Sequence, residues 1–453
     1  MNYINKVRGK KAKIAAALGL SVAVVLSGCA TPADEPAANE TAATEEVATE
    51  ISIMNRWSDP ITLAVVEELF AAFTAETGIA IKNESLPVEG DTYATAVRAG
   101  LSSSTPPDIV VNIAGPSVAA FAEGGVLKDL TEFYSSELAA RSSDGAIAGM
   151  KFEDKIYAIS AGSAVGNLVY VNPEYLAQYG VDAAAVTTFE EWTAAMKKVK
   201  DAGGTPIVAG IKDQWPSGHY LNDVVQRALG SEAASTMYSR TVAAGAPDSP
   251  KWTDAAVVDA FEAYKSLTPL LQEGFAGESS DVAASIFTSG NAGYFKMGSW
   301  FLSTIVQTEP AFTPDVMLFP PFEDGAGDGS EVTLSNIAMM VSKDANWKAV
   351  QIFLEFFTRP DVAAKYGAGT SQVMPYKITS SLSVVEPIIK EQWDKISGFA
   401  ANASAAALFN DQSLDVNFYQ KHIWQGSVGM MTGQLSIADL TKNLEEDTAK
   451  LQE

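Results

Sequence analysis

The fold is decided by residues 51–113. Within this stretch ISIMN (51–55) is followed by the helical pattern DPITLAVVEELFAAFTAETG (59–78), then by IAIK (79–82), and later by IVVNI (109–113). Short apolar, β-branched runs alternate with a segment whose apolar residues recur every three or four positions, which is typical of strands separated by a helix. Strands that alternate with helices form a parallel sheet through right-handed crossovers. The stretch therefore predicts an α/β fold.

In a sheet of this kind, ligands bind beyond the carboxyl ends of the strands. Here those ends are residues 55–59 and 112–117, and both are polar. The helix between the first two strands should start at Asp59-Pro60 and stop at Gly78. The face of this helix that is expected to pack on the sheet consists of Leu63, Val66, Phe70 and Phe73.

Later segments continue the same alternation. Thr188 to Glu191 form a capping box at the start of a helix, and a short strand is expected at 206–209. Further helices are expected near 254–267 and 347–357, the second ending before Pro360. No repeat of fixed period occurs, so a solenoid or propeller is excluded.

Composition narrows the class of function. The chain has 453 residues, with 31 Lys and Arg against 55 Asp and Glu, and a formal net charge of -24. A chain this acidic is repelled by phosphate backbones, so nucleic-acid binding is not expected. The single cysteine excludes an intrachain disulfide framework and a multi-thiolate metal site. The two histidines, His219 and His422, lie far apart in the sequence, and we expect no metal and no cofactor.

The N-terminus has the features of an exported lipoprotein. Residues 1–28 combine a basic start with an apolar run (14–26) that is too short to span a bilayer, as in a signal peptide. LSGC (26–29) resembles the bacterial lipobox, and this resemblance implies cleavage before Cys29 and diacylation of its thiol. A core cysteine after an ordinary secretory signal is the alternative interpretation.

Residues 29–50 should then be the lipidated N-terminus and a disordered tether, since they consist mainly of Ala, Thr, Pro and acidic residues. No later run is long enough for a transmembrane helix, so the lipid would be the only anchor. We expect the mature protein at the extracytoplasmic face of the bacterial cell membrane.

Enzyme signatures are absent from the sequence. It contains no G-x-S-x-G elbow, no G-x-x-x-x-G-K-[ST] phosphate loop and no H-E-x-x-H zinc helix. With only two histidines, a Ser-His-Asp triad has few ways to form, and each histidine is interpreted as a hydrogen-bonded structural imidazole.

Tryptophans in loops are the main candidates for ligand contacts. Trp57 follows the first strand, Trp215 lies in KDQWP (212–216), and Trp300 ends KMGSW (296–300). Sugar rings have apolar CH faces that stack on indoles and a rim of hydroxyls that bind Asp, Asn or Gln. A tryptophan is more often part of a core than of a ligand platform, so the core interpretation stays open for each.

An ordered set of motifs makes the resemblance to a known family specific. The chain resembles the family 1 extracellular solute-binding proteins of carbohydrate ABC transporters, the group that includes maltose-binding protein. The match runs over nearly all of residues 50–453. The motifs that carry it are TGI (77–79), TPPDIV (105–110), GGVLKDLT (124–131), KIYA (155–158), YVNPEYL (170–176), TFEEW (188–192), KDQWP (212–216), GSW (298–300) and FLEFF (353–357).

This resemblance implies a two-lobed periplasmic-binding-protein-like fold of type II. Each lobe would be a mainly parallel sheet flanked by helices, and a hinge would close the lobes on the ligand. The three chain crossings between lobes would fall near 160–165, 334–336 and 373–377. The N-terminal lobe would be 50–161 plus 336–375, and the C-terminal lobe 165–333 plus 378–453.

The resemblance also implies where ligand contacts lie. By position in the family they are Arg56, Trp57, Asn112, Asp213, Trp215, Trp300 and Trp424. The chain departs from the family at two crossings, where Ser335-Asn336 replaces the usual glycine pair and SAVGN (163–167) lacks the acid found in maltose binders. These departures argue against a maltose-like specificity.

The leading hypothesis is a monomeric, lipid-anchored receptor that binds a di- or oligosaccharide and delivers it to an ABC transporter permease, without catalysis. A second hypothesis keeps the fold and changes the ligand to a glycerol-phosphate ester or another small polar solute. A third is a secreted carbohydrate-active enzyme that uses Asp213 and a second acid across the scissile bond.

Overall fold

The computed structural model describes residues 47–87, 92–242, 248–376 and 386–452. The predicted signal peptide, Cys29 and most of the predicted tether lie outside the described residues. The tether prediction ends one residue too late, because Glu50 already belongs to the first strand and pairs with Ala80.

The N-terminal stretch folds as its sequence pattern predicts. Its elements are β1 (Glu50–Asn55), α1 (Pro60–Thr77), β2 (Ala80–Ser85), α2 (Thr92–Leu101) and β3 (Ile109–Ile113). β1 pairs in parallel with both β2 and β3. The side chain of Asp59 caps α1 by accepting a hydrogen bond from the backbone of Thr62, and Gly78 ends α1 in the left-handed conformation. Leu63 is only half-buried, because the inward face of α1 is centred on Val66 and Phe70 and includes Leu69.

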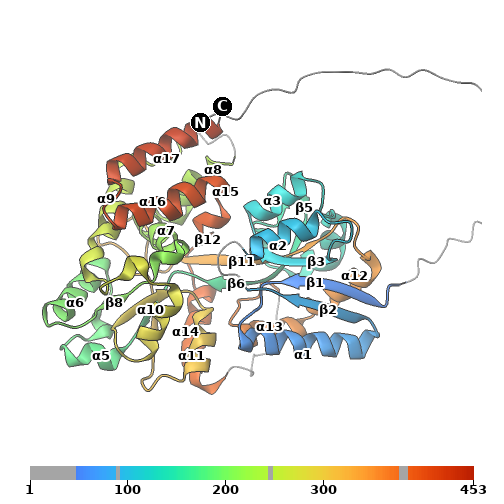
Figure 1. Ribbon diagram of the computed structural model, residues 1–453, viewed down its shortest axis with the longest axis horizontal. Coiled ribbons are helices and arrows are strands. Elements are labelled where there is room, and N and C mark those ends of the chain that lie inside the picture. Colours follow the sequence, from blue (N-terminus) through green and yellow to red (C-terminus); the bar gives the residue numbers. More distant parts are fainter. Residues whose placement is uncertain (1–46, 88–91, 243–247, 377–385, 453) are drawn as a thin grey trace, which may run out of the picture. The chain divides into compact units, whose positions relative to one another are not determined.

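The first sheet has the order β12-β11-β3-β1-β2, with β6 also paired to β11. Its remaining strands are β6 (Ala158–Val165), β11 (Val332–Val341) and β12 (Ala406–Leu408). In Figure 1, α1 lies on one side of β1 to β3, and α2 and α3 (Pro116–Glu123) lie on the other. Neighbours on β3 therefore enter different cores: Val111 packs with α1, and Val110 with α2 and α3.

The second sheet has the order β10-β7-β9-β8. Its strands are β7 (Leu168–Val171), β8 (Ile207–Val208), β9 (Tyr294–Met297) and β10 (Asp315–Leu318). The prediction of a mainly parallel sheet is wrong here, since only β8 and β9 are parallel while β7 is antiparallel to both β9 and β10. The order of the strands along the chain explains why β7 and β10 are antiparallel. β7 leads the chain away from β6, whereas β10 leads it back toward β11, so the two strands run in opposite directions.

The three segments predicted to cross between lobes lie side by side. Ser163 in β6 pairs with Asn336 in β11, and its hydroxyl donates to the Asn336 amide oxygen at 2.5 Å. The backbone of Ser163 also exchanges two hydrogen bonds with Val373, at 2.7 and 2.9 Å. The division of the chain into lobes at these residues stays a prediction, and residue 378, the expected start of its last segment, lies outside the described residues.

Helices and short turns complete the two lobes. In the first half of the chain they are α4 (Thr131–Phe133), η1 (Tyr134–Leu138), η2 (Ala139–Arg141), η3 (Asp144–Ile147), the hairpin β4 (Lys151–Phe152) and β5 (Lys155–Ile156), α5 (Pro173–Gln178), η4 (Ala183–Ala185), α6 (Phe189–Asp201), η5 (Ile211–Asp213) and α7 (Trp215–Leu229). In the second half they are α8 (Ser231–Ser239), α9 (Ala255–Ser266), η6 (Thr268–Leu270), η7 (Phe275–Gly277), α10 (Ser280–Thr288), α11 (Phe301–Thr308), α12 (Trp347–Phe357), α13 (Pro360–Thr370), η8 (Pro387–Ile389), α14 (Lys390–Ala401), η9 (Asn410–Gln412), α15 (Val416–Phe418), η10 (Tyr419–Gln425), α16 (Gly426–Met431) and α17 (Ile437–Leu451).

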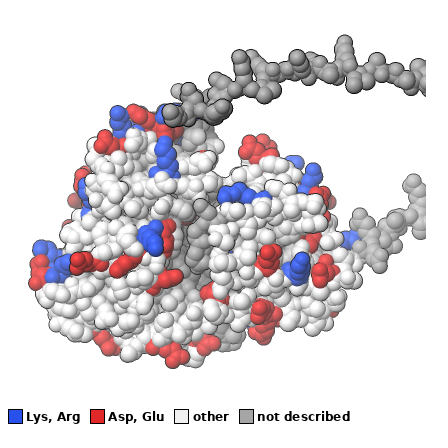
Figure 2. Space-filling model, in the orientation of Figure 1, with Lys and Arg blue, Asp and Glu red and all other residues white. Residues whose placement is uncertain are grey.

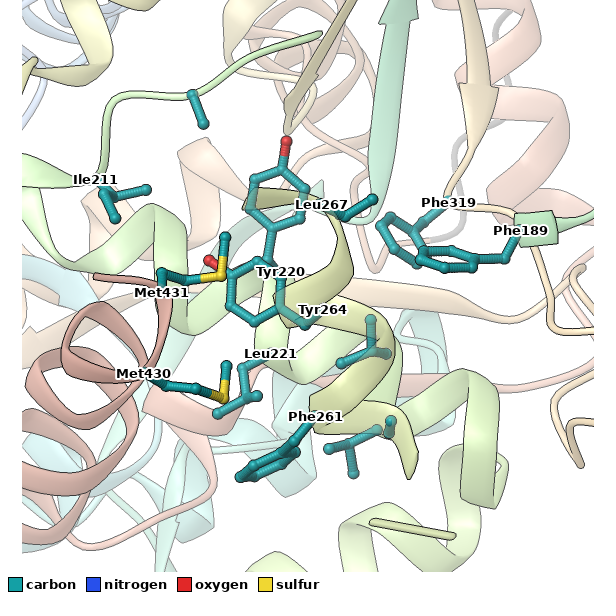
Figure 3. Close-up of a cluster of buried hydrophobic side chains, with 14 of the residues drawn as sticks. Phe189, Ile211, Tyr220, Leu221, Phe261, Tyr264, Leu267, Phe319, Met430 and Met431 are labelled. Atoms are coloured by element: carbon teal, nitrogen blue, oxygen red, sulfur yellow. The ribbon is translucent and has the colours of Figure 1, made fainter. Parts of the chain in front are cut away.

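Helix α7 is the central helix of the second lobe, and its residues from Pro216 to Arg227 are all buried. Figure 3 shows part of the surrounding core, in which Tyr220 of α7 stacks on Tyr264 of α9 at a centroid distance of 5.4 Å. Met430 and Met431 of α16 belong to the same cluster. This packing fixes α7, and the N-terminal part of α7 supplies two side chains of the candidate site.

Two further properties of the described residues are their surface charge and the hydropathy of their helices. On the face drawn in Figure 2, Lys and Arg side chains are interspersed with Asp and Glu and form no basic patch. Within the described ranges, none of the helices combines the length and apolar character that crossing a bilayer requires.

Candidate ligand-binding site

Two of the predicted tryptophans meet in an aromatic cluster, which we define as Trp215, His219, Trp300 and Phe409. Trp215 begins α7, and Trp300 immediately precedes α11. Their ring centroids are 6.1 Å apart, and Trp215 lies 5.0 Å from His219, one helical turn along α7. The imidazole of His219 stacks on Phe409 at 3.7 Å with an interplanar angle of 9°. Both indoles are half-buried, so each retains exposed ring surface.

Glycines make room for three of the nearby rings. A Cβ on Gly166 would lie 1.9 Å from the Phe409 ring, and a Cβ on Gly298 would lie 2.1 Å from the Trp300 ring. On α7, a Cβ on Gly218 would lie 2.4 Å from Cδ1 of Trp424. Any other residue at these positions would force the ring to move.

Trp424 lies beside the aromatic cluster, on the π-helix η10. Its ring lies 5.0 Å from Tyr419 of the same helix, and its indole Nε1 is buried with no hydrogen-bond partner among the described residues. Asn410 lies against the same turn of α7, where its Nδ2 donates to the Gly218 carbonyl at 2.9 Å. The Oδ1 of Asn410 is likewise buried and without a described partner.

His219 is held in one orientation by Asp411, whose Oδ2 lies 3.1 Å from the imidazole Nε2. Burial lowers the pKa of His219, and the hydrogen bond and charge of Asp411 only partly oppose this effect. The imidazole is therefore neutral at pH 7, with its proton assigned to Nε2 by the contact to Asp411. The other nitrogen, Nδ1, is buried without a described partner.

A buried ion pair lies behind the aromatic cluster. Lys296 of β9 contacts Asp223 of α7 at 3.0 Å, and its Nζ lies 5.2 Å from the centroid of Phe409. Burial lowers the pKa of Lys296 and raises that of Asp223, and their mutual attraction opposes both shifts. The positive end of Lys296 thus faces one side of the Phe409 ring.

Arg56 brings a charge from the end of β1 to the vicinity of Asp411. Burial lowers the pKa of the Arg56 guanidinium, while the negative charge of Asp411 acts in the opposite direction. The hydroxyl of Tyr93 donates to the Val111 carbonyl on β3. The charge of Asp411 therefore acts on His219 of α7 and on Arg56, the residue that follows β1.

Three other predicted site residues, Trp57, Asn112 and Asp213, have partners outside the aromatic cluster or none that is described. Trp57 is 6% exposed and packs on Tyr366 at 5.9 Å and on Phe70 at 6.3 Å, as a core residue does. Asp213 is exposed, and its Oδ2 accepts hydrogen bonds from the backbone and hydroxyl of Ser280. Asn112 is half-buried at the end of β3. No described contact joins these three residues to the cluster.

The sequence analysis missed the contribution of the segment after β12, which consists of Phe409, Asn410, Asp411 and Gln412. A polar sequence beyond the carboxyl end of a strand could have identified this segment, as it identified residues 55–59 and 112–117. It was hidden because β12 has only three residues and is too short to recognise by pattern. Gln412 accepts from the Asn336 backbone at 2.9 Å, so this segment is bonded to the crossing strand β11.

Two cavities lie elsewhere in the described part of the chain. One of about 230 Å³ is lined by residues of α1, α11 and α13, and an open groove of about 570 Å³ runs beside α5 and α10. Neither is lined by the predicted ligand contacts. Within the described ranges, no group of His, Cys, Asp and Glu side chains is arranged to hold a metal ion.

Sequence comparison relates the chain to binding proteins of transporters. An uncharacterised ABC transporter extracellular-binding protein of Pyrococcus horikoshii is 21% identical over 284 residues, which are 62% of this chain and 62% of that protein. The multiple sugar-binding protein of Streptococcus mutans serotype c is 23% identical over 219 residues, 48% of this chain and 50% of that protein. The matched region thus spans between half and two thirds of these relatives' lengths.

Fold comparison agrees with this relation. The solved structure of the bacterial solute receptor AcbH, described as having an exclusive preference for β-D-galactopyranose, matches with a TM-score of 0.77 and 18% identity over 89% of this chain and 99% of that one. This likeness is one of fold: two α/β lobes of the periplasmic-binding-protein type. The family described as bacterial extracellular solute-binding protein matches residues 58–364. This match covers more than half of the sequence, and the chain therefore belongs to the family of bacterial extracellular solute-binding proteins.

Proposed function

We propose that the protein is a receptor for a neutral sugar, a di- or oligosaccharide, which it binds between its two lobes. The observation that carries this proposal is the pair of half-buried indoles, Trp215 and Trp300, set 6.1 Å apart on the starts of two helices. Flat CH faces of a pyranose ring complement such surfaces. The sugar-binding relative in Streptococcus mutans supports the same ligand class.

Polar groups beside the indoles fit the rim of a sugar. Among the described residues, His219 Nδ1 and Asn410 Oδ1 are acceptors without a partner, and Trp424 Nε1 is a donor without one. A buried polar atom left without a partner costs about 1–3 kcal/mol, so a ligand that supplies the partner gains affinity. Hydroxyl groups can donate and accept, and they suit all three atoms.

The charges near the aromatic cluster favour a neutral ligand over a phosphate ester. Arg56 has Asp411 in its electrostatic reach, and Lys296 is paired with Asp223 at 3.0 Å. A phosphate site needs cations that are free to form charge-assisted hydrogen bonds. Because Asp223 already pairs with Lys296 and the negative charge of Asp411 acts on Arg56, the glycerol-phosphate hypothesis has less support.

The same contacts weigh against a glycoside-cleaving enzyme. Hydrolysis needs two carboxylates placed across the scissile bond. Asp213 is engaged with Ser280, and Asp411 with His219. We propose that the protein does not transform its ligand but hands it to an ABC transporter permease, as a monomer anchored to the extracytoplasmic face of the membrane through Cys29.

A ligand screen followed by titration tests this function. Thermal unfolding is measured with neutral mono-, di- and oligosaccharides and with glycerol phosphates. A ligand at 100 times its Kd should stabilise the protein by about 2.7 kcal/mol. We expect stabilisation by a neutral sugar, with no sugar consumed on prolonged incubation. Stabilisation by phosphate esters alone, or release of cleaved sugar, would contradict the proposal.

A further inference from the structure

The π-helix η10 has two different sides. Tyr419 and Trp424 lie on the side of the candidate site, whereas the consecutive residues Lys421 and His422 both contact α17. π-Helices are rare, are less regular than α-helices, and occur mostly at functional sites. Such a segment needs tertiary contacts to keep its conformation.

Asp447 of α17 supplies these contacts from outside the site. Its Oδ2 accepts from His422 Nε2 at 2.7 Å and from Lys421 Nζ at 2.7 Å, and its Oδ1 accepts from Lys450 Nζ at 2.5 Å. These three donors hold the pKa of Asp447 far below its usual range. The side chain of His422 is only 6% exposed, so part of this network is shielded from solvent.

Apolar contacts also hold the segment, since Ile423 is buried in the core and lies with Trp424 against Gly218 of α7, and further contacts hold its two ends. At its start, Asp415 caps α15 by accepting from the Phe418 backbone at 3.0 Å. At its end, Gly426 packs on α17 so closely that a Cβ there would lie 2.6 Å from Leu440. Between these ends, Asp447 joins two successive residues of η10 to α17.

We propose that Asp447 is a positioning residue for the ligand site: it touches no ligand, and it sets the orientation of Trp424 by anchoring the π-helix. This inference rests on the proposed sugar-binding function. A π-turn holds one residue more than an α-turn, so relaxation of η10 to an α-helix would turn the following side chains by about 100°. Trp424 would then leave its place against Gly218.

The test compares Asp447→Asn with Glu446→Gln. Glu446 is the neighbouring acid on α17, and its only described ion pair is an exposed one with Lys442 at 3.7 Å. Asp447→Glu tests whether a carboxylate on a longer side chain restores the contacts. Lys421→Gln removes one exposed donor and is a milder variant if Asp447→Asn does not fold.

In ligand-free protein labelled with fluorotryptophan, the ¹⁹F resonance of Trp424 and hydrogen exchange of residues 419–425 are measured. Sugar affinity is then measured by calorimetry.

We expect Asp447→Asn to shift the Trp424 resonance, to speed exchange across 419–425, and to weaken sugar binding by about threefold to thirtyfold, with Glu446→Gln unchanged. An unchanged Trp424 resonance in Asp447→Asn would overturn the inference. So would unchanged affinity for a sugar that the wild type binds. If the wild type binds no sugar, the proposed function fails, while the resonance and exchange still decide whether Asp447 orients Trp424.

Discussion

At the scale of single residues, the tryptophans differ in what surrounds them. Trp215 and Trp300 are half-buried near polar atoms that have no partner in the described part of the chain, whereas Trp347 lies in the first lobe against Phe133. Loss of a stacking indole at a binding hot spot costs roughly 2 kcal/mol, or about thirtyfold in Kd. We expect this loss for Trp215→Ala and for Trp300→Ala by calorimetric titration, and no change in affinity for Trp347→Ala. Unchanged affinity in both site variants would remove the indoles from the site.

The pKa shifts of the histidines predict how stability depends on pH. Burial lowers the pKa of His219 and of His422. The unfolded chain therefore binds protons from about pH 6.5 downward, before the folded protein does, and the folded state loses stability as the pH falls through this range. His219→Gln should make this decline shallower in thermal melts between pH 7 and pH 5. An equally steep decline in the variant would mean that His219 does not titrate as its burial predicts.

At the scale of elements, α7 carries a glycine where a helix would normally favour alanine. Ala is preferred over Gly inside a helix by about 1 kcal/mol. At Gly218, however, a Cβ would clash with Trp424, whereas at Gly398 of α14 a Cβ would meet nothing within 4 Å. We expect Gly218→Ala to lower both the melting temperature and the sugar affinity, and Gly398→Ala to raise the melting temperature slightly. A stabilised Gly218→Ala variant with full affinity would show that the ring is not seated there.

Elements that depend on neighbouring residues could be predicted from the sequence, and those that depend on distant pairing could not. β1, α1 and β2 follow from local patterning and from the capping residues Asp59 and Gly78. The strand directions of the second sheet depend on pairing between β7 and β9, more than a hundred residues apart, which no local pattern records. Trp57 and Trp215 both lie in short polar segments of the sequence, yet only packing distinguishes the core residue from the half-buried one.

At the scale of the whole molecule, a receptor with two lobes should change shape on binding. Only a ligand that contacts both lobes favours the closed form over the open one. Small-angle scattering should give a smaller radius of gyration at saturating sugar than without it. An identical profile would exclude closure, and the same measurement with a sugar that does not bind serves as the control.

The proposed membrane attachment is also tested on the whole molecule. If Cys29 carries the lipid, Cys29→Ser should release the protein from the membrane fraction, because the anchor would be the only attachment. Fractionation followed by immunoblotting measures this, with Trp347→Ala as an anchored control. Retention of Cys29→Ser as firm as that of the wild type would contradict lipid anchoring.

The pairing of β12 with β11 has a consequence for engineering a sensor. Leu408 is in register with Leu334 on the crossing strand, and the next three residues are Phe409, Asn410 and Asp411. If the lobes rotate about the crossing strands, these side chains would move with β12, and ligand occupancy would then change the angle between the lobes. A dye attached to the exposed Ala406 would lie on β12, the strand that moves. Its emission should report the ligand without any label in the recognition surface.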